Sequence, residues 1–224
     1  MTETQKIVYD YISDSILRLS SLYPRLIAIS GKDASGKTVM ANILGEYLKD
    51  KTDRQIIRIS ADDFMNERVI RRTVTGSEGE SCYKYTFNFN ALKKFALGPL
   101  QPNANYVYKT KFFDQTTDSK MISNNKRADN DAIIIVDGVF LFKKDLANYW
   151  SLKILLETAD NIVIERGAMR DINRIGNYED ARNKYINRYI ASQTIYYNEE
   201  HPEKSSDIII NNDDFNSPFV VSAI

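Results

Sequence analysis

The sequence lacks most of the features of secreted, membrane-spanning and nucleic-acid-binding proteins. Its 224 residues include one cysteine, Cys82, which excludes an intramolecular disulfide and favours a reducing compartment. No apolar run reaches membrane-spanning length, and the chain does not start with a cationic segment followed by an apolar core. Thirty basic and thirty acidic residues leave no net charge. We therefore expect a cytoplasmic protein with a small-molecule ligand and with no membrane or nucleic-acid partner.

The apolar residues that are present predict a single α/β domain over residues 1–224. Val8, Ile12 and Ile16 recur at helical spacing, which predicts an amphipathic helix within residues 3–22 that covers a sheet. Short apolar runs then alternate with longer periodic segments, and this alternation predicts a parallel sheet with helices on both faces. The expected strands are 25–30, 54–60, 132–136, 151–157 and 207–210, and the expected later helices include 90–97, 160–174 and 178–198.

Two polar stretches, 65–88 and 114–131, show no clear period. Both are longer than the usual connection between two elements of a compact domain. We therefore expect them to be active-site loops.

A phosphate-binding pattern follows the first predicted strand. The segment Gly31–Thr38 matches G-x-x-x-x-G-K-[ST] and leads into an amphipathic helix, as a phosphate-binding loop requires. Its backbone N–H groups would surround the phosphates of ATP, Lys37 would contact the β- and γ-phosphates, and the Thr38 hydroxyl would bind Mg²⁺. The predicted ATP-binding residues are Gly31, Lys32, Asp33, Ala34, Ser35, Gly36, Lys37 and Thr38.

Carboxylates follow two of the predicted strands, at the sheet edge where open α/β proteins bind ligands. Asp62 and Asp63 come after the second strand, where a carboxylate could take the proton from an acceptor hydroxyl, although a helix cap or turn would also explain them. Asp137 comes after the third strand, where it could hold Mg²⁺ together with Thr38, although an Asp-Gly turn is the alternative.

Three arginines recur every four residues on a predicted helix. Arg166, Arg170 and Arg174 therefore project from nearly the same face and could meet the charge on a transferring phosphoryl group. The alternative is a solvated face on which Glu165 and Asp171 pair with them.

Taken together and in order, these segments resemble the uridine kinase and phosphoribulokinase group of P-loop kinases over about residues 25–214. The resemblance also includes Val136–Leu141, Arg188-Tyr189, Pro202 and Ser206–Asn212. It implies a three-layer α/β/α P-loop NTPase fold with a mainly parallel sheet, a helix 1–23 packed on it and a helical lid at about 166–190. It also implies Asp62 as the catalytic base beside Lys37, Asp137 on the magnesium side, and Arg166 and Arg170 in the lid. Members of this group often form homo-oligomers.

The resemblance suggests an acceptor site but not the acceptor. The segment Tyr108–Asp114 resembles the β-hairpin that borders the acceptor in these kinases, so Tyr108, Phe113, Asp62 and Asp63 are the candidate acceptor contacts. Authentic uridine-cytidine kinases place a histidine beside the pyrimidine, whereas the only histidine here, His201, lies far downstream. A nucleoside is the first expectation; another small alcohol, such as pantothenate, ribulose 5-phosphate or glycerate, is the alternative.

Two other functions are compatible with a P-loop. A switch GTPase is disfavoured, because Asn125–Ala128 lacks the final acid of a guanine-binding signature. A protein that binds ATP without transferring its phosphate would explain the loop, but it would leave Asp62 and the arginines without a role.

Overall fold

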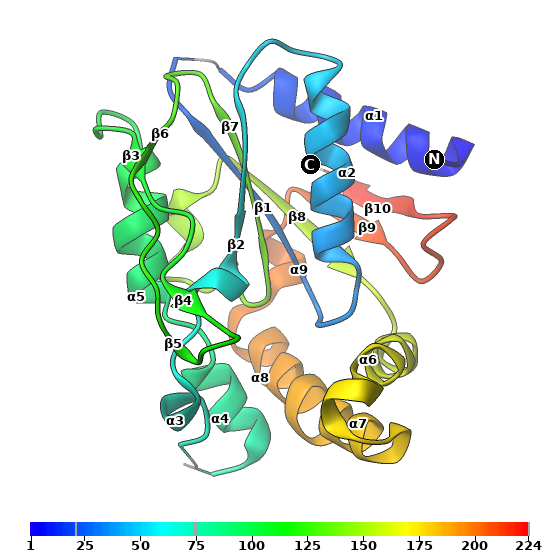
Figure 1. Cartoon of the computed structure of the whole chain (residues 1–224). Helices are drawn as coiled ribbons and strands as arrows, with labels where there is room; N and C mark the ends of the chain where they lie inside the picture. Colours follow the sequence, from blue (N-terminus) through cyan, green and yellow to red (C-terminus); the bar gives the residue numbers. More distant parts are fainter. Residues whose placement is uncertain (21, 74–75, 224) are drawn as a thin grey trace.

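The computed structural model describes residues 1–20, 22–73 and 76–223 and is built on one six-stranded sheet (Figure 1). The strand order is β10-β9-β8-β1-β7-β2. Every neighbouring pair is parallel except β9 with β10, which is antiparallel. The strands are β1 (Arg25–Gly31), β2 (Ile56–Ser60), β7 (Ile133–Gly138), β8 (Leu152–Glu157), β9 (Ile208–Asn211) and β10 (Phe219–Ala223). The predicted mainly parallel sheet is confirmed.

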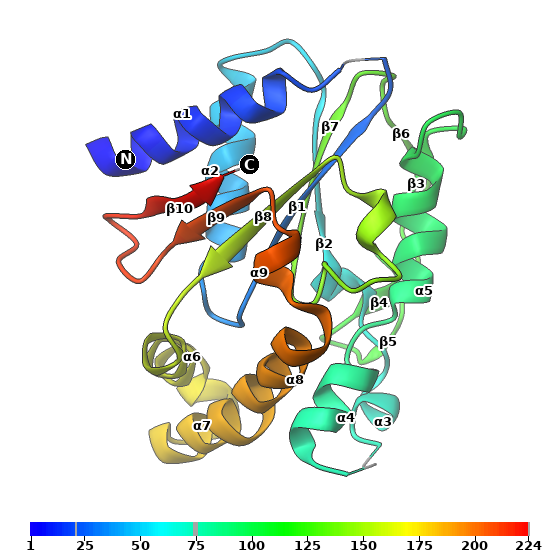
Figure 2. The same cartoon turned by 180° about the vertical axis from the view of Figure 1, so that it is seen from behind.

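Alternating side chains of the central strands pack into two separate cores. On β1, Ile27 and Ile29 join the core formed with α1 (Glu3–Leu17) and α2 (Lys37–Lys49). Leu26 and Ala28 point to the other face. There the sheet is covered by α5 (Phe89–Leu92), the π-helical turn η2 (Lys93–Leu97) and part of α8 (Ala191–Glu200). Because strand side chains alternate between faces, a strand covered on both sides must be apolar throughout. Figures 1 and 2 show these layers from opposite sides.

A group of helices lies beyond the carboxyl ends of the parallel strands, at the lower end of Figure 1. It consists of α3 (Arg68–Arg71), α4 (Glu78–Tyr85), α6 (Asp160–Ile175), α7 (Tyr178–Lys184), the π-helical segment η5 (Tyr185–Ile190) and α8. Shorter elements complete the described chain: η1 (Ala61–Phe64), η3 (Gly98–Leu100), η4 (Ala147–Tyr149) and α9 (Pro202–Ser205). The helical group faces the end of β1, so a cleft forms between it and the phosphate-binding loop.

Several predicted boundaries are corrected by the structure. The stretch 65–88 is not simply a loop, because it contains α3 and α4. Ser77 and Glu80 form a capping box at the start of α4, but the helix has too few turns for its period to be recognised. The stretch 114–131 contains β5 (Ser119–Lys120), which pairs with β4 (Phe113–Asp114), and β6 (Lys126–Arg127), which pairs with β3 (Val107–Tyr108). Strand β10 was not predicted.

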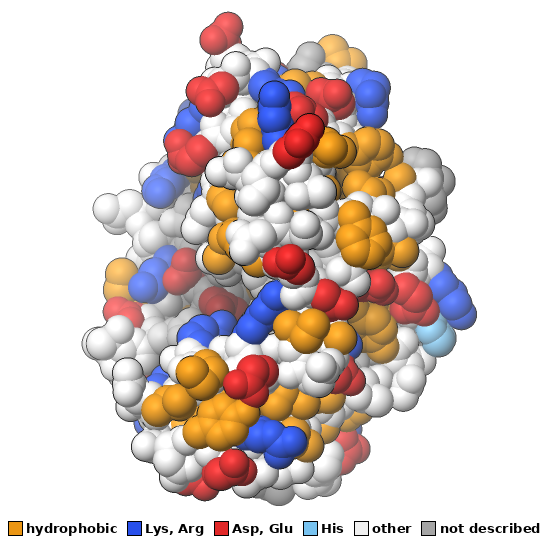
Figure 3. Space-filling view, turned by 90° about the vertical axis from the view of Figure 1, so that its right-hand side faces the viewer, with side chains coloured by type: hydrophobic (Ala, Val, Ile, Leu, Met, Phe, Trp, Pro, Cys, Tyr) orange, Lys and Arg blue, Asp and Glu red, His pale blue; other side chains and the backbone are white. Residues whose placement is uncertain are grey.

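The surface away from the cleft has no strong charge asymmetry on the face that Figure 3 shows. Basic and acidic side chains are interspersed there, and apolar side chains gather toward the lower end of the view. Among the described residues, no helix has the length and apolar character needed to cross a membrane.

Candidate active site

The predicted phosphate-binding loop joins β1 to α2 and depends on two glycines. Gly36 has φ = 96°, and a Cβ there would lie 2.7 Å from Nδ2 of Asn212. A Cβ on Gly31 would lie 2.4 Å from the backbone oxygen of Leu156. Helix α2 starts at Lys37 with no side chain capping its first N–H groups. Those groups therefore remain available for an anion at the positive end of the helix dipole.

The side chains of the loop hold it to its surroundings. Lys32 forms an ion pair with Asp160 at the start of α6. Asp33 accepts a hydrogen bond from the backbone of Ala34 at 2.9 Å and a weaker one from Arg170 at 3.3 Å. The backbone oxygen of Ser35 accepts a bond of 2.7 Å from Asn212. The loop is thus tied on one side to the helix after β8 and on the other to the end of β9.

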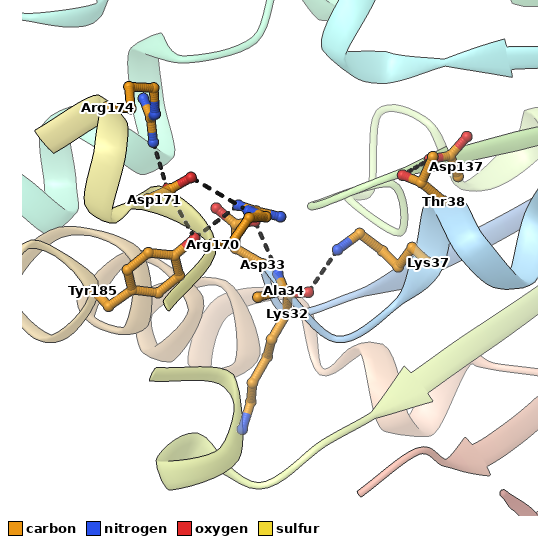
Figure 4. A network of polar contacts seen from close by, with 10 residues as sticks. All are labelled: Lys32, Asp33, Ala34, Lys37, Thr38, Asp137, Arg170, Asp171, Arg174 and Tyr185. Atoms are coloured by element: carbon orange, nitrogen blue, oxygen red, sulfur yellow. Dashed lines mark hydrogen bonds and ion pairs between the residues drawn. The ribbon is translucent and has the colours of Figure 1, made fainter. Parts of the chain in front are cut away.

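Lys37 lies buried beneath the loop. Its Nζ donates to the backbone oxygen of Lys32 at 2.5 Å, so the amine is directed into the curve of the loop (Figure 4). Burial lowers the pKa of Lys37, and the carboxylates of Asp33 and Asp62 oppose that shift. An anion bound in the loop would stabilise the charged amine further, because an opposite charge nearby favours the ionised form.

Thr38 and Asp137 meet at the start of α2, as the sequence predicts for a magnesium site. The Thr38 hydroxyl donates to Oδ2 of Asp137 at 2.6 Å, and Asp137 is 2% exposed. Two oxygen ligands beside a phosphate loop fit Mg²⁺, which keeps several waters and takes few protein ligands. No group of three or more potential metal-binding side chains occurs in the described ranges.

Arg58 is a second partner of Asp137, and the sequence did not predict it. Its guanidinium donates to Oδ1 of Asp137 at 2.6 Å and to Asn42 at 3.0 Å. The pair orients the buried carboxylate so that Oδ2 faces Thr38. The available signal was a cation between two apolar residues of a strand, Ile57 and Ile59, since a charged side chain usually needs a partner when the sheet is covered.

The two carboxylates after β2 face different surroundings. Asp62 lines the cleft together with Lys37 and Asp137. Asp63 points toward the β4 region instead, where Lys111 lies 4.0 Å from its Oδ1 and Phe112 donates to its backbone oxygen. Of the two candidates for the catalytic base, Asp62 is the one that lines the same cavity as the predicted phosphate site.

The surroundings of Asp62 suit a general base. The side chain is exposed in the cleft, but the protein atoms around it remove part of the hydration of the carboxylate, and this desolvation is the main reason that its pKa rises to about 6. The carboxylate of Asp33 adds to the rise, and the amine of Lys37 opposes it. A base whose pKa lies just below neutral pH is ionised and still basic enough to accept a proton.

The three arginines of α6 do not share one role. Arg166 donates to the backbone oxygens of Asn212 and Asp213 at 2.9 and 2.5 Å, so its contact with a phosphoryl group stays a prediction. Arg170 bridges Asp33 and the Tyr185 hydroxyl, with the latter bond at 2.7 Å (Figure 4). Arg174 pairs with Asp171 at 2.5 Å. Of these, Arg170 is the one in contact with the phosphate-binding loop.

The predicted aromatic acceptor contacts lie elsewhere. Tyr108 is 4% exposed and Phe113 is fully buried, and neither lines the cleft. Each lies between one apolar and one polar neighbour in the chain, which gives no sign of this burial. The candidate residues for magnesium, for the phosphates and for the base therefore line one cleft. The two aromatic candidates are packed in the protein interior beside it.

The cleft is one cavity of about 1230 Å³. Ligand pockets of proteins usually have volumes of about 300–1,000 Å³, so this cavity has room for a nucleotide and a small second substrate. A parallel sheet, a phosphate loop with its buried lysine, and a carboxylate across the cleft define the P-loop kinase class.

Comparison with known proteins agrees with a P-loop kinase and identifies the family within that class. Residues 26–212 match the model of the phosphoribulokinase / uridine kinase family, and the chain belongs to that family. A uridine kinase of Lactobacillus helveticus is 28% identical over 197 residues, covering 84% of this chain and 86% of the relative. A uridine kinase of Clostridium novyi is 27% identical over 194 residues, with the same coverage. The protein is therefore an enzyme of the kinase type that uses ATP as phosphate donor.

Solved structures show that the fold is shared among kinases with different names. A structure described as a possible uridine kinase from Bacillus stearothermophilus superposes with a TM-score of 0.73 at 22% identity, covering 91% of this chain and 97% of the other. A D-glycerate 3-kinase from Cryptococcus neoformans gives a TM-score of 0.59 at 11% identity, covering 98% of this chain and all of the other. These similarities concern the fold and leave the acceptor open.

Proposed function

We propose that this kinase transfers the γ-phosphate of Mg²⁺-bound ATP to a hydroxyl of a small metabolite, with Asp62 as the catalytic base. The observation that carries the proposal is the position of Asp62, which lines the same cavity as Lys37, Thr38 and Asp137. A protein that only bound ATP would need the loop and Lys37 but would gain nothing from a carboxylate with a raised pKa at this position.

The chemistry is an in-line displacement. Asp62 accepts the proton of the acceptor hydroxyl while the oxygen bonds to the γ-phosphorus and the bond to the β–γ bridging oxygen breaks, which releases ADP. Lys37 and the N–H groups at the start of α2 stabilise the phosphate charge. Mg²⁺, held by Thr38 and Asp137, would supply further charge neutralisation. Arg170 contacts the loop from the lid and would help close the site around the phosphates.

A nucleoside is the first acceptor to test, because the relatives that match most of the chain are described as uridine kinases. The other acceptors are small alcohols such as pantothenate, ribulose 5-phosphate and glycerate. Incubating the protein with ATP, Mg²⁺ and each acceptor, then scoring phosphorylated product by mass, tests the reaction. ATP binding with no product from any of them would favour a binding-only protein.

Replacing the base tests the mechanism. Asp62→Asn should lower kcat by about 10²- to 10⁴-fold, the usual range for general acid–base catalysis, with the KM for ATP nearly unchanged. Asp63→Asn is the matched control, because it removes a neighbouring carboxylate that faces Lys111 instead of the cleft. If Asp63→Asn gives the larger loss, the base role belongs to Asp63.

A further inference from the structure

The wall of the cleft opposite the phosphate-binding loop carries a concentration of positive charge. Arg72 at the end of α3, Arg174 on α6, Lys184 on α7 and Arg188 on η5 all line the cavity. We call these four residues the cationic cluster. Arg174, Lys184 and Arg188 lie within residues 174–188, whereas Arg72 lies far earlier in the chain and is brought to them by the packing of α3 and α4 against η5. This contrasts with the mixed charges on the outer face in Figure 3.

Few acidic groups compensate this charge. Arg174 pairs with Asp171, but Asp171 is shared with Arg170 at 3.4 Å. Arg188 donates to the backbone oxygen of Arg71 at 3.2 Å. Over residues 1–20, 22–73 and 76–223, Arg72, Lys184 and Arg188 form no ion pair. Glu78 also lines the cavity, but it is exposed and forms no ion pair in the same ranges.

Lys184 is the most informative member of the cluster. It is half-buried beside the ring of Tyr189, with 5.8 Å from Nζ to the ring centroid. Burial lowers the pKa of Lys184, and the positive charges of Arg174, Arg188 and Arg72 lower it further, against a single opposing carboxylate, Asp171. A half-buried amine beside three cations is unfavourable unless an anion completes the site.

The cationic cluster lies apart from the groups expected to hold the phosphates of ATP. Arg170 is the residue of α6 that contacts the loop, through Asp33. Arg174 is one turn further along the helix, a rise of about 6 Å, and Figure 4 shows it on the side of Arg170 away from Lys37. The P-loop already provides Lys37 and the helix N-terminus for the donor. The cluster therefore places further positive charge in the same cavity, apart from the P-loop.

We propose that the cationic cluster binds a carboxylate or phosphate group of the acceptor, so that the enzyme phosphorylates an anionic alcohol rather than a neutral one. This inference rests on the proposed kinase function. It favours acceptors of the glycerate, pantothenate or ribulose 5-phosphate type over an unsubstituted nucleoside. A guanidinium fork and an ammonium group can bind either kind of anion, so the site defines the charge of the acceptor and not its identity.

Binding of inorganic phosphate tests the site without turnover. The protein is first saturated with Mg²⁺ and a non-hydrolysable ATP analogue, which fills the P-loop, and phosphate is then titrated at constant ionic strength. We expect saturable binding that Lys184→Met weakens about 10- to 100-fold, the range for charge-assisted bonds. Arg182→Met is the matched control, since Arg182 is an exposed cation on the same helix that does not line the cavity. No binding, or equal binding by both variants, would overturn the proposal.

Pairs of acceptors test the same site during catalysis. Glycerate is compared with glycerol, pantothenate with its alcohol analogue, and ribulose 5-phosphate with ribulose, alongside uridine. The anionic member of an accepted pair should be used at much lower concentration. Lys184→Met should raise the KM for that acceptor about 10- to 100-fold while the KM for ATP stays constant.

The outcomes separate the two proposals. Phosphorylation of uridine with a KM unaffected by Lys184→Met would refute the anionic-acceptor inference but support the kinase function. Absence of any product, with phosphate binding still dependent on Lys184, would refute the proposed function of Asp62 while leaving the anion site in place.

Discussion

The two walls of the cleft present positive charge by different means. The loop wall uses eight consecutive residues, Gly31–Thr38, in which backbone N–H groups and one buried lysine face the cavity. The opposite wall, which we call the lid wall after the helical lid predicted at about 166–190, uses side chains from α3, α6, α7 and η5, most of them arginines. A backbone site depends on local geometry, whereas a side-chain site depends on how distant segments pack.

The two walls also differ in how many acidic groups offset their positive charge. At the loop wall, Lys37 has carboxylates nearby: Asp33, Asp62 and Asp137 all act on its pKa. At the lid wall, Lys184 has three cations around it and one acid. Three carboxylates thus oppose the burial of the Lys37 charge at the loop wall, whereas a single carboxylate does so for Lys184 at the lid wall.

Among the changes that compare the two walls, the largest effect is expected from removing the charge of the loop wall. Lys37→Met keeps the apolar stem but removes the amine, and we expect kcat to fall by at least about 10²- to 10³-fold, as for loss of one transition-state donor. Steady-state kinetics on the accepted substrate measures this, with a thermal melt to show that the fold is kept. A loss below tenfold would mean that the lid wall carries most of the phosphate stabilisation.

A smaller effect is expected from disturbing the packing that builds the lid wall. A Cβ on Gly167 would lie 2.0 Å from Cε1 of Tyr185, a fully buried ring whose hydroxyl contacts Arg170 and Asp171. Gly167→Ala should therefore lower the free energy of unfolding by about 1–3 kcal/mol, as overpacking does. Denaturant unfolding measures the change.

The matched control lies behind the loop wall. A Cβ on Gly45 of α2 would have its nearest neighbour at 3.5 Å, an ordinary contact. Gly45→Ala should be neutral or stabilise the protein by up to about 1 kcal/mol, because alanine is the better helix former. Equal destabilisation by both substitutions would contradict the tight contact between α6 and Tyr185.

The smallest effect is expected from the protonation of Asp62 as the pH falls. Because its pKa is raised to about 6, the carboxylate becomes protonated as the pH falls below that value, and the protonated form cannot accept a proton. We expect kcat/KM to fall about tenfold between its plateau and pH 5, a change of about 1.4 kcal/mol. A pH–rate profile at saturating magnesium measures it, and a flat profile from pH 7 to pH 5 would argue against Asp62 as the base.

Lys37 provides a check on that profile. Its positive charge lowers the pKa of Asp62. In Lys37→Met the inflection should therefore move to higher pH, provided that residual turnover is measurable.

Local patterns in the sequence predicted the strand before the phosphate-binding loop and the helix after it, and the structure has both. Gly31–Thr38, the strand before it and the helix after it depend on residues that are neighbours in the chain, so their period and order are visible. Asp62 and Asp137 were found because strand ends in a parallel sheet share one edge. The ion pair of Arg58 with Asp137 was not predicted, because the two residues lie on neighbouring strands that are far apart in the sequence. No residue spacing in the chain indicates such a pair.

Contacts between distant segments also limited the prediction of the lid wall. The spacing of Arg166, Arg170 and Arg174 correctly indicated one helix face but could not show that Arg166 binds backbone oxygens beyond β9. Tyr108 and Phe113 lie in a segment that resembles the β-hairpin bordering the acceptor, but packing buries both side chains. Helices α3 and α4 were read as loop because each is short.

The sequence by itself determined the class of this protein. The order of the phosphate-binding loop, the two strand-end carboxylates and the arginine helix is a property of the chain, and it specifies a P-loop kinase. The tertiary structure alone decided which carboxylate faces the cleft and which cations gather opposite the loop. Burial and the distance between charges set these properties, and both arise only when segments far apart in the chain pack together.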